Sequence, residues 1–332
     1  MTWLITGGAG YIGAHVVHAM IASGERVVVL DDLSSGVAER LPAEVPVVRG
    51  SVSDGAVVAG ALAAHEVTGV VHLAARKRVP ESVAEPLLYY RENVGGLVTL
   101  LEAMAAAGVR RLVFSSSAAV YGSPDVALVT EETPCRPVNP YGETKLAGEW
   151  LVRAAGRAGG LETVCLRYFN VAGAARPEWA DRGAANVIPL FFERISAGLP
   201  PVIFGDDYPT PDGTCVRDYV HVADLAEAHL AAARALERSA PGGPGGDLTV
   251  NVGTGRGVSV RELADLVGEV TGRPELAPVV AERRAGDPAR VVASAELAGL
   301  RLGFAARHDL REMVASAWDG WCHRAEAAPR AG

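Results

Sequence analysis

The sequence has few cysteines, few aromatic side chains and no long apolar run. It contains four scattered cysteines, with no Cys-x-x-Cys pair and no histidine at metal-ligand spacing: Cys135, Cys165, Cys215 and Cys322. This excludes a disulfide scaffold and a zinc site of the usual spacing, and it favours free thiols. No apolar run reaches the roughly eighteen residues of a membrane helix. The chain also enters its first strand without a leader pattern. We therefore expect a cytoplasmic protein with no membrane partner and no metal.

The sequence also has fewer basic than acidic residues. Lysine and arginine number 31 against 39 acidic residues, which gives a net charge of −8. A chain this acidic has no basic footprint for nucleic acid, which we exclude as a partner. Glycine, in contrast, is abundant, with 38 among 332 residues. The length is sufficient for a large core and for two lobes.

The most informative stretch is Thr6–Gly13 (TGGAGYIG). It follows the apolar run Trp3–Ile5, a predicted strand, and it opens an amphipathic helical pattern. Its glycines, Gly7, Gly10 and Gly13, allow a tight turn and a close backbone approach to a pyrophosphate. The new helix then directs its unpaired N–H groups at that anion. The order strand, glycine turn and helix predicts a dinucleotide site.

The second apolar run, Arg26–Leu30, ends in two acidic residues, Asp31 and Asp32. They lie about twenty residues after the glycines, where a carboxylate binds the adenosine ribose. An acid at this place repels a 2′-phosphate. We therefore predict NAD rather than NADP.

Strands and helices alternate through the first half of the chain. The predicted strands are Trp3–Ile5, Arg26–Leu30, Val45–Arg49, Gly69–Ala75, Arg111–Phe114 and Glu162–Arg167, and the predicted helices include Asp54–His65, Pro86–Ala107 and one that starts at Tyr141. This alternation predicts an α/β fold with a Rossmann-type, doubly wound parallel sheet.

The alternation breaks after the sixth strand, which predicts a smaller C-terminal α/β substrate lobe. Here we expect a return strand at Asp218–His221, a surface loop at Ser239–Asp247, a strand at Leu248–Val252, and helices at Pro189–Ala197, Val222–Leu236, Ser259–Val270 and Asp309–Arg324. Ser259 and Glu262 have capping-box spacing. The predicted domains are residues 1–171 with the returning segments 214–238 and 248–256, and residues 172–213 with 257–332.

Tyr141 and Lys145 form a Tyr-x-x-x-Lys pair at the start of a predicted helix. Residues four apart share a helix face, so the ammonium can lie beside the phenol. A tyrosine has an ordinary pKa near 10, and a nearby cation, together with the positive nicotinamide ring, stabilises its phenolate. Tyr141 could then remove a proton from a sugar hydroxyl while a hydride leaves the same carbon.

The strand Arg111–Phe114 empties into three serines, Ser115, Ser116 and Ser117. A hydroxyl at this sheet edge can donate to the substrate oxygen and relay a proton to Tyr141. We choose Ser117 for this role, and Ser116 is the alternative.

With these motifs in view, the chain resembles the UDP-glucose 4-epimerases of the extended short-chain dehydrogenase/reductase family. The matching blocks run over nearly its whole length: Thr6–Gly13, Ser115–Gly122, Tyr141–Lys145, Arg167–Gly173, Phe204–Pro209 and Asp212–Val222. The resemblance implies a retained NAD that oxidises C4 of a UDP-hexose and then returns the hydride to the opposite face. It also implies a homodimer through the helices near Pro86–Ala107 and Tyr141–Arg157.

The resemblance implies two sets of binding residues. The cofactor set comprises Gly7, Gly10, Tyr11, Ile12, Gly13, Asp31, Asp32, Ser51, Val52, Leu73, Ala74, Ala75, Lys77, Asn93, Ser115, Tyr141, Lys145, Tyr168 and Phe169. The substrate set comprises Lys77, Ser117, Tyr141, Asn170, Asn186, Val187, Val202, Phe204, Arg217, Arg284, Asp287 and Val291. In the second set the arginines would bind the diphosphate and Asp287 a ribose.

Some positions depart from the family pattern. Ser51 stands where relatives commonly have an aspartate near the adenine, Glu92 where they often have an asparagine, and Pro80 where glycine is usual. Val291 falls at a position that is a bulky tyrosine in some members. A small side chain there leaves room for an N-acetyl group, so we expect UDP-N-acetylglucosamine to be a substrate as well.

The same motifs bear on four alternative functions. A 4,6-dehydratase, and likewise a UDP-glucuronate decarboxylase, is disfavoured because Ala118 and Ala119 replace the acidic residues of the dehydratase family. An epimerase for UDP-glucuronate stays open. A non-catalytic NAD-binding protein is disfavoured because it would not need Ser117, Tyr141 and Lys145.

Overall fold

The computed structural model describes residues 1–183, 186–238, 247–284 and 286–327. Its centre is a seven-stranded sheet with the order β10-β6-β5-β4-β1-β2-β3, in which every pairing is parallel. The strands are β1 (Thr2–Thr6), β2 (Arg26–Asp31), β3 (Val47–Arg49), β4 (Gly69–His72), β5 (Arg111–Ser115), β6 (Glu162–Tyr168) and β10 (Asp247–Val252). The strand order reverses between β1 and β4, so the predicted Rossmann-type sheet is confirmed.

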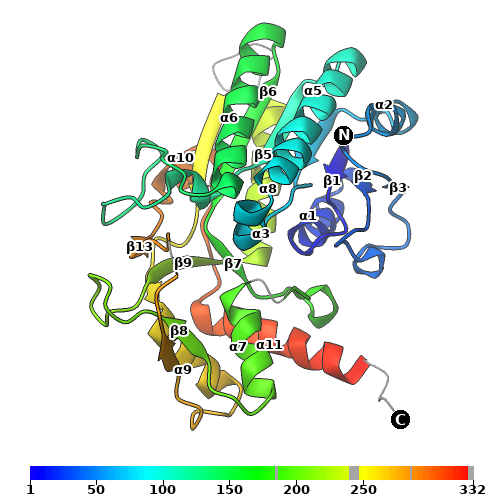
Figure 1. The fold of residues 1–332 in the computed structure, drawn as a ribbon. Helices are drawn as coiled ribbons and strands as arrows, with labels where there is room; N and C mark the ends of the chain where they lie inside the picture. The colour runs from blue at the N-terminus through cyan, green and yellow to red at the C-terminus, as the bar shows by residue number, and fades with distance from the viewer. Residues whose placement is uncertain (184–185, 239–246, 285, 328–332) are drawn as a thin grey trace.

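Helices cover both faces of this sheet (Figure 1). One face carries α1 (Tyr11–Ala22), α8 (Val222–Arg238) and α10 (Glu296–Leu302), and the other carries α2 (Gly55–Ala64), α5 (Gly96–Ala107) and α6 (Pro140–Gly159). Strand β1 shows why its sequence is apolar throughout. Trp3 and Ile5 pack into the core on the α1 side, whereas Leu4 packs into the core on the α5 side. A strand buried on both faces reads as a continuous apolar run.

The second half of the chain builds a separate lobe below the sheet (Figure 1). It contains a four-stranded sheet of β7 (Asn170–Ala172), β9 (Val216–His221), β11 (Gly257–Ser259) and β13 (Arg290–Val291), and a pair formed by β8 (Val202–Phe204) and β12 (Val279–Ala281). Helices α7 (Val187–Ser196), α9 (Val260–Val270) and α11 (Leu310–Ala327) surround a core of their own with these strands. The expected smaller α/β lobe is therefore present.

One placement predicted from the sequence is wrong. Strand β9, the expected return strand Asp218–His221, pairs with β7, β11 and β13 rather than with the central sheet. Of the returning segments, α8 packs on the central sheet and β10 extends it beside β6. The buried carboxylate of Asp218 explains the position of β9, because it accepts hydrogen bonds from the backbone N–H groups of Thr254, Gly255 and Ala293. The expected loop Ser239–Asp247 lies outside the described residues, except for Asp247.

The predicted helix Pro86–Ala107 is interrupted. It consists of α4 (Pro86–Tyr89), a π-helical turn η2 (Tyr90–Gly95) and α5. The widened turn directs the side chain of Asn93 at the segment after β4, where it bonds to the backbone of Arg76. Such π turns often occur at functional sites. Four further short helices are α3 (Val79–Ala84), η1 (Ala38–Arg40), η3 (Ala118–Tyr121) and η4 (Pro177–Trp179).

Side-chain caps fix the starts of helices α6 and α9. Asn139 Oδ1 accepts from the Gly142 N–H at 2.9 Å at the start of α6, which ends at Gly160 with φ of +69°. Ser259 and Glu262 exchange hydrogen bonds of 3.0 and 2.8 Å at the start of α9, so the predicted capping box is confirmed. No helix within the described ranges is long and apolar enough to cross a bilayer.

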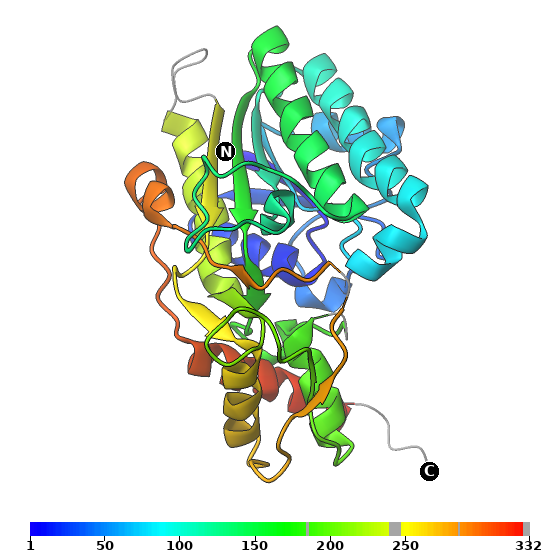
Figure 2. The same cartoon turned by 60° about the vertical axis from the view of Figure 1, so that its left-hand side comes forward.

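The segment 122–139, between η3 and α6, connects the two lobes on the side that Figure 2 brings forward. The Val129 N–H donates to Val292 O at 2.7 Å, and the Ser294 N–H donates to Val129 O at 2.7 Å. Asn251 of β10 also donates to Val129 O, at 2.9 Å. The segment therefore joins the edge of the central sheet to the strand that carries Val291.

Candidate active site

The glycine turn after β1 forms a backbone cradle at the carboxyl edge of the sheet. A Cβ on Gly13 would lie 2.1 Å from Gly7 O, and one on Gly7, whose φ is +71°, would lie 2.8 Å from Ala74 N. Both positions therefore require glycine. The N-terminus of α1 opens beside the reversal between β1 and β4, which is where nucleotides bind in such sheets. The residues present fit a dinucleotide.

Asp31 fixes this cradle to the end of β2. Its Oδ2 accepts from the Ala9 N–H at 2.9 Å, and its Oδ1 accepts from the Leu33 N–H at 2.8 Å. Burial raises the pKa of this carboxyl, and the two backbone hydrogen bonds act in the opposite direction. Asp32 lies beside it, and its Oδ1 accepts from the backbone and the hydroxyl of Ser34. The predicted ribose-binding acids therefore lie at the glycine cradle.

The other predicted cofactor residues follow the carboxyl ends of neighbouring strands and so lie along one sheet edge. They are Ser51 and Val52 after β3, Leu73, Ala74, Ala75 and Lys77 after β4, Ser115 at the end of β5, and Tyr168 and Phe169 at the end of β6. Two residues also bond within the protein. Tyr11 donates to Gly173 O at 2.5 Å, and Asn93 secures the segment before Lys77 while it donates to Thr144 Oγ1 at 3.1 Å.

Tyr141 lies in the first turn of α6, where its side chain is 9% exposed. The nearby side chain of Ser117 acts to lower the pKa of its phenol. Because Ser117 Oγ accepts from the Ala119 N–H at 3.2 Å, its hydroxyl hydrogen is free to donate to the phenol. Ser116 instead donates to Glu149 at 2.6 Å. The structure thus brings Ser117, and not the alternative Ser116, to the phenol.

Lys145 lies one turn further along α6 and is 4% exposed. Its Nζ donates to Ser115 O at 2.8 Å, and burial lowers its pKa to about 8. Burial raises the pKa of Tyr141, and only the Ser117 hydrogen bond acts to lower it. The stabilisation of the phenolate by Lys145 together with the nicotinamide ring stays a prediction, because burial and Ser117 are the causes of the pKa shift among the protein's own groups. A further positive charge is needed, and the oxidised nicotinamide ring carries one.

Two neutral histidines lie beneath these groups. His72 is hydrogen-bonded to Thr6 Oγ1 at 2.8 Å, and His229 to Ser115 Oγ at 2.9 Å. Burial lowers the pKa of His72 to about 3, with a smaller contribution from the charge of Lys145. Burial also lowers the pKa of His229 to about 4. These rings therefore stay uncharged at neutral pH and add no positive charge beside Lys145.

On the opposite side, the second lobe places Arg217, Asp287 and Val291 together. Arg217 and Val291 are partners in the pairing of β9 with β13, and Arg217 Nη2 lies 3.7 Å from Asp287 Oδ1. Val291 is 7% exposed and packs in a cluster with Leu146 and Phe169. Val291, the residue predicted to limit substrate size, therefore packs in one cluster with Leu146 of α6, the helix that carries Tyr141.

The remaining predicted substrate residues lie nearby on the same lobe. The guanidinium of Arg284 stacks on the ring of Phe204 at 3.8 Å, and Asn170 of β7 lies opposite Tyr219 of β9 in the strand register. Asn186 occupies the N-cap position of α7 just before Val187 without a side-chain cap bond, and its amide donates to Asp181 at 2.9 Å. Val202 begins β8. Asn186 is therefore held by a partner that the sequence did not indicate.

Comparisons with known proteins agree with this geometry. The family model described as "NAD dependent epimerase/dehydratase family" matches residues 3–253. The UDP-glucose 4-epimerase of Azospirillum brasilense is 45% identical over 96% of this chain and 91% of that protein. The chain belongs to the NAD-dependent epimerase/dehydratase family. The resemblance drawn from the sequence motifs is thus confirmed, as is the prediction of NAD as cofactor.

Solved structures extend the likeness of this epimerase/dehydratase chain. A UDP-glucose 4-epimerase from Stenotrophomonas maltophila, with bound NAD and formylated UDP-arabinopyranose, is 38% identical with a TM-score of 0.93, over 99% of this chain and 100% of that one. The enzyme from Bifidobacterium longum, in complex with NAD⁺ and UDP, is 34% identical with a TM-score of 0.90, over 98% and 99%.

Sequence reasoning missed two residues behind the site, Glu149 and Arg167. Glu149 is a carboxylate on the inward face of α6, and Arg167 is a cation at the end of a buried strand. Charged residues are almost never fully buried unless they are paired. An acid on the Tyr141 face of the helix and a base in an apolar strand were the signal for such a pair.

The buried histidines predict a pH dependence of stability. A histidine in the unfolded chain has a pKa of about 6.5, well above the folded values of about 3 and about 4 for His72 and His229. Because the unfolded state binds more protons below pH 6.5, stability falls as the pH drops through this window. We expect His229→Gln to remove about 2 kcal/mol of the stability loss between pH 7 and pH 5, measured by urea unfolding. The exposed His323→Gln variant serves as control. An unchanged pH dependence in His229→Gln would contradict the assignment.

Proposed function

We propose that the protein interconverts UDP-glucose and UDP-galactose by NAD-dependent epimerisation at C4 of the hexose. The observation that carries the proposal is the buried group of Ser117, Tyr141 and Lys145 at the sheet edge that also bears the glycine cradle, where Lys145 is bonded to the end of β5. Neither Ala118 nor Ala119, the next residues, can transfer the protons that a dehydratase needs. The curated relatives with this name support the same reaction.

Tyr141 is the base and later the acid. It removes the proton of the C4 hydroxyl and returns it after the sugar has turned, and Ser117 donates a hydrogen bond to the same oxygen. NAD, when bound, supplies the hydride acceptor and donor. Lys145 keeps a positive charge beside the site while its ammonium holds the carbonyl at the end of β5. The buried surroundings exclude water and strengthen these charge interactions.

The second lobe anchors the nucleotide and leaves the sugar free to turn. Arg217 and Arg284 bind the diphosphate, Asp287 binds a ribose, and Phe204 offers an aromatic face to the base. In the described structure Arg284 covers that face and Arg217 pairs with Asp287. Substrate therefore replaces both contacts when it binds. The sugar itself meets mainly Asn170, Asn186 and Val291.

The test is to incubate purified protein with UDP-galactose, without added cofactor, and to follow UDP-glucose. Removal of the phenol oxygen in Tyr141→Phe leaves the cradle intact, so NAD stays bound while turnover falls by about 10²–10⁴-fold. The control is Tyr90→Phe, which removes a 40% exposed phenol that donates to Glu143 on the same helix as Tyr141 and takes no part in the proposed chemistry. Unchanged turnover in Tyr141→Phe would refute the role of the base. UDP-glucuronate assayed in parallel separates the neutral from the acidic sugar.

We also propose the homodimer. Large apolar side chains are exposed on adjacent helices: Val83 of α3 at 63%, Leu87 of α4 at 81% and Trp150 of α6 at 61%. Helices α3 and α4 both contact α6, so these residues belong to one surface of the chain. An apolar surface of this kind favours a protein partner, and a second copy offers the same helices.

The dimer is tested by introducing negative charge on this apolar surface. Leu87→Asp combined with Trp150→Asp should convert a dimer into a monomer in sedimentation velocity, because two unpaired carboxylates would be buried. Leu300→Asp is the control, since Leu300 is 74% exposed on α10, away from this surface. A wild-type monomer, or a dimer that survives the double change, would contradict the proposal.

A further proposal is that UDP-N-acetylglucosamine is also a substrate, because Val291 is small. In Val291→Tyr we expect turnover of the acetylated sugar to fall at least about tenfold. Turnover of UDP-galactose by the same variant reports whether the packing with Leu146 and Phe169 has survived. Undiminished activity on the acetylated sugar would remove the steric argument. The cytoplasmic location expected from the sequence stays a prediction.

A further inference from the structure

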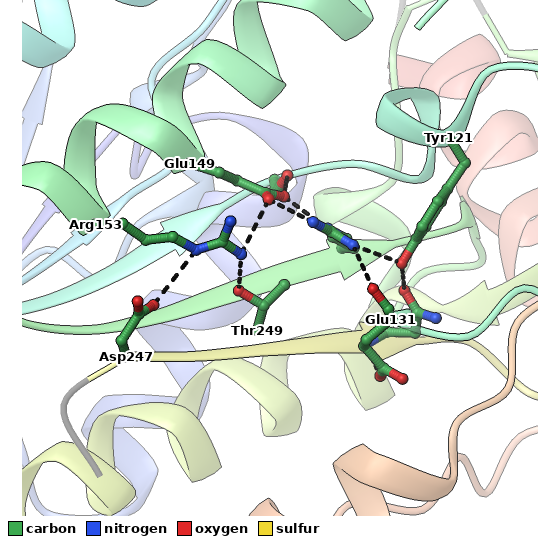
Figure 3. Close-up of polar contacts among 9 residues, drawn as sticks. Tyr121, Glu131, Glu149, Arg153, Asp247 and Thr249 are labelled. Atoms are coloured by element: carbon green, nitrogen blue, oxygen red, sulfur yellow. Dashed lines mark hydrogen bonds and ion pairs between the residues drawn. The ribbon is translucent and has the colours of Figure 1, made fainter. Parts of the chain in front are cut away.

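Behind the proposed active site, a buried network of charged and polar side chains joins α6 to β6 and β10 (Figure 3). At its centre Glu149 is 0% exposed and Arg167 is 3% exposed. Arg167 Nε donates to Glu149 Oε1 at 2.8 Å, and its Nη2 donates to Oε2 at 2.6 Å. Such a pair is costly to desolvate, and apolar side chains of similar size often stabilise a fold as well. Stability alone is therefore a weak reason for its presence.

Ser116 is also hydrogen-bonded to the carboxylate of this ion pair. Its hydroxyl donates to Glu149 Oε1 at 2.6 Å. Ser116 lies between Ser115, whose carbonyl binds Lys145, and Ser117, whose hydroxyl contacts Tyr141. Glu149 follows Tyr141 by two turns on the same face of α6. One carboxylate thus ties the helix that carries the phenol to the strand end that carries its hydroxyl partner.

The guanidinium of Arg167 binds the C-terminal end of η3, the short helix that follows Ser117. Arg167 Nη1 donates to the hydroxyl of Tyr121 at 2.9 Å, and that hydroxyl donates to Asn251 Oδ1 at 2.7 Å. Tyr121 ends η3, the short helix that Ser117 caps. Ser116, just before the N-cap of this helix, and Tyr121, its last residue, are therefore both bonded to the ion pair.

We propose that Glu149 and Arg167 are positioning residues, which hold the Ser117 hydroxyl against the Tyr141 phenol through Ser116 and Tyr121. Neither touches the phenol. The proposal rests on the proposed role of Tyr141. It predicts that loosening the pair weakens the Ser117–Tyr141 contact before it unfolds the protein.

A weaker contact has a measurable sign. The Ser117 hydrogen bond lowers the pKa of Tyr141, so its loss raises that pKa. The other titratable groups around the phenol are Lys145 on α6 and Tyr168 at the end of β6. Lys145 donates to Ser115 O, and Ser115 acts on the pKa of Tyr168, so changes at Ser116 remove neither influence.

The test compares Ser116→Ala, Glu149→Gln and their combination in the purified, NAD-retaining protein. Ser116→Ala retains the Glu149–Arg167 ion pair, so we expect this variant to fold like the wild type. We expect kcat with UDP-galactose to fall at least about tenfold in each single variant while KM stays within about twofold. The titration of Tyr141, followed by near-ultraviolet absorbance without substrate, should shift to higher pH. Thr249→Val, at the outer end of the network beside Arg153, is the control and should leave all of these unchanged.

The combined variant decides whether Ser116 acts through Glu149. If it does, the double change loses no more activity than the larger single change. Losses that multiply would overturn the proposal. A fall in kcat with lost NAD or a lower thermal midpoint, but no shift in the phenol titration, would overturn it too. An inactive wild-type protein would reject the proposed function instead, and the substrate-free titration would still test the positioning.

Discussion

A buried phenol at the start of α6 is the constraint on which the rest of the site depends. Burial raises the pKa of Tyr141, although a base at neutral pH needs it lowered. Each pKa unit corresponds to about 1.4 kcal/mol, so lowering a tyrosine pKa from its ordinary value of about 10 to about 7 requires about 4 kcal/mol from neighbouring charges. Lys145 lies one turn away but donates to Ser115 O. With NAD⁺ bound, the nicotinamide ring would supply the further positive charge that a phenolate base at Tyr141 needs.

This dependence relates the glycine cradle to the chemistry. The close contacts of Gly7 and Gly13 bring the start of α1 to the reversal of strand order. The carboxylate of Asp31 accepts hydrogen bonds from Ala9 in the same turn and from Leu33 after β2, and so holds the turn at the end of β2. A dinucleotide held there would lie along the carboxyl edge of the sheet, near Ser117 after β5 and Tyr141 in the first turn of α6. Neutral His72 and His229 beneath this edge leave Lys145 as the cation next to the phenol.

Much of this arrangement could be predicted from sequence because it follows local signals. The glycine spacing, the apolar strands and the Tyr141–Lys145 spacing each have a short-range physical cause, and the central sheet and the capping box at Ser259 emerged as expected. The position of β9 could not be predicted, since its apolar pattern suits either sheet. Its partners are decided by hydrogen bonds of Asp218 to residues far along the chain.

The π turn around Asn93 and the pair Glu149–Arg167 were missed for a similar reason. A helical periodicity does not reveal one widened turn, and the partners of a buried charge lie on other elements. The direction of the Tyr141 pKa shift also needed the structure. Sequence spacing places Lys145 beside the phenol, but only the fold shows that its ammonium is bonded elsewhere and that the phenol is buried.

The most direct measurement is the titration of Tyr141, by near-ultraviolet absorbance, in the protein loaded with NAD⁺ and again with NADH, using Tyr141→Phe to identify the signal. With the positive ring of NAD⁺, we expect a phenolate to form well below the ordinary tyrosine pKa of about 10. With the uncharged ring of NADH, the midpoint should move upward by at least about two units. Equal midpoints in the two states, or no tyrosine that titrates below its ordinary value, would contradict the assignment of Tyr141 as a base completed by the cofactor.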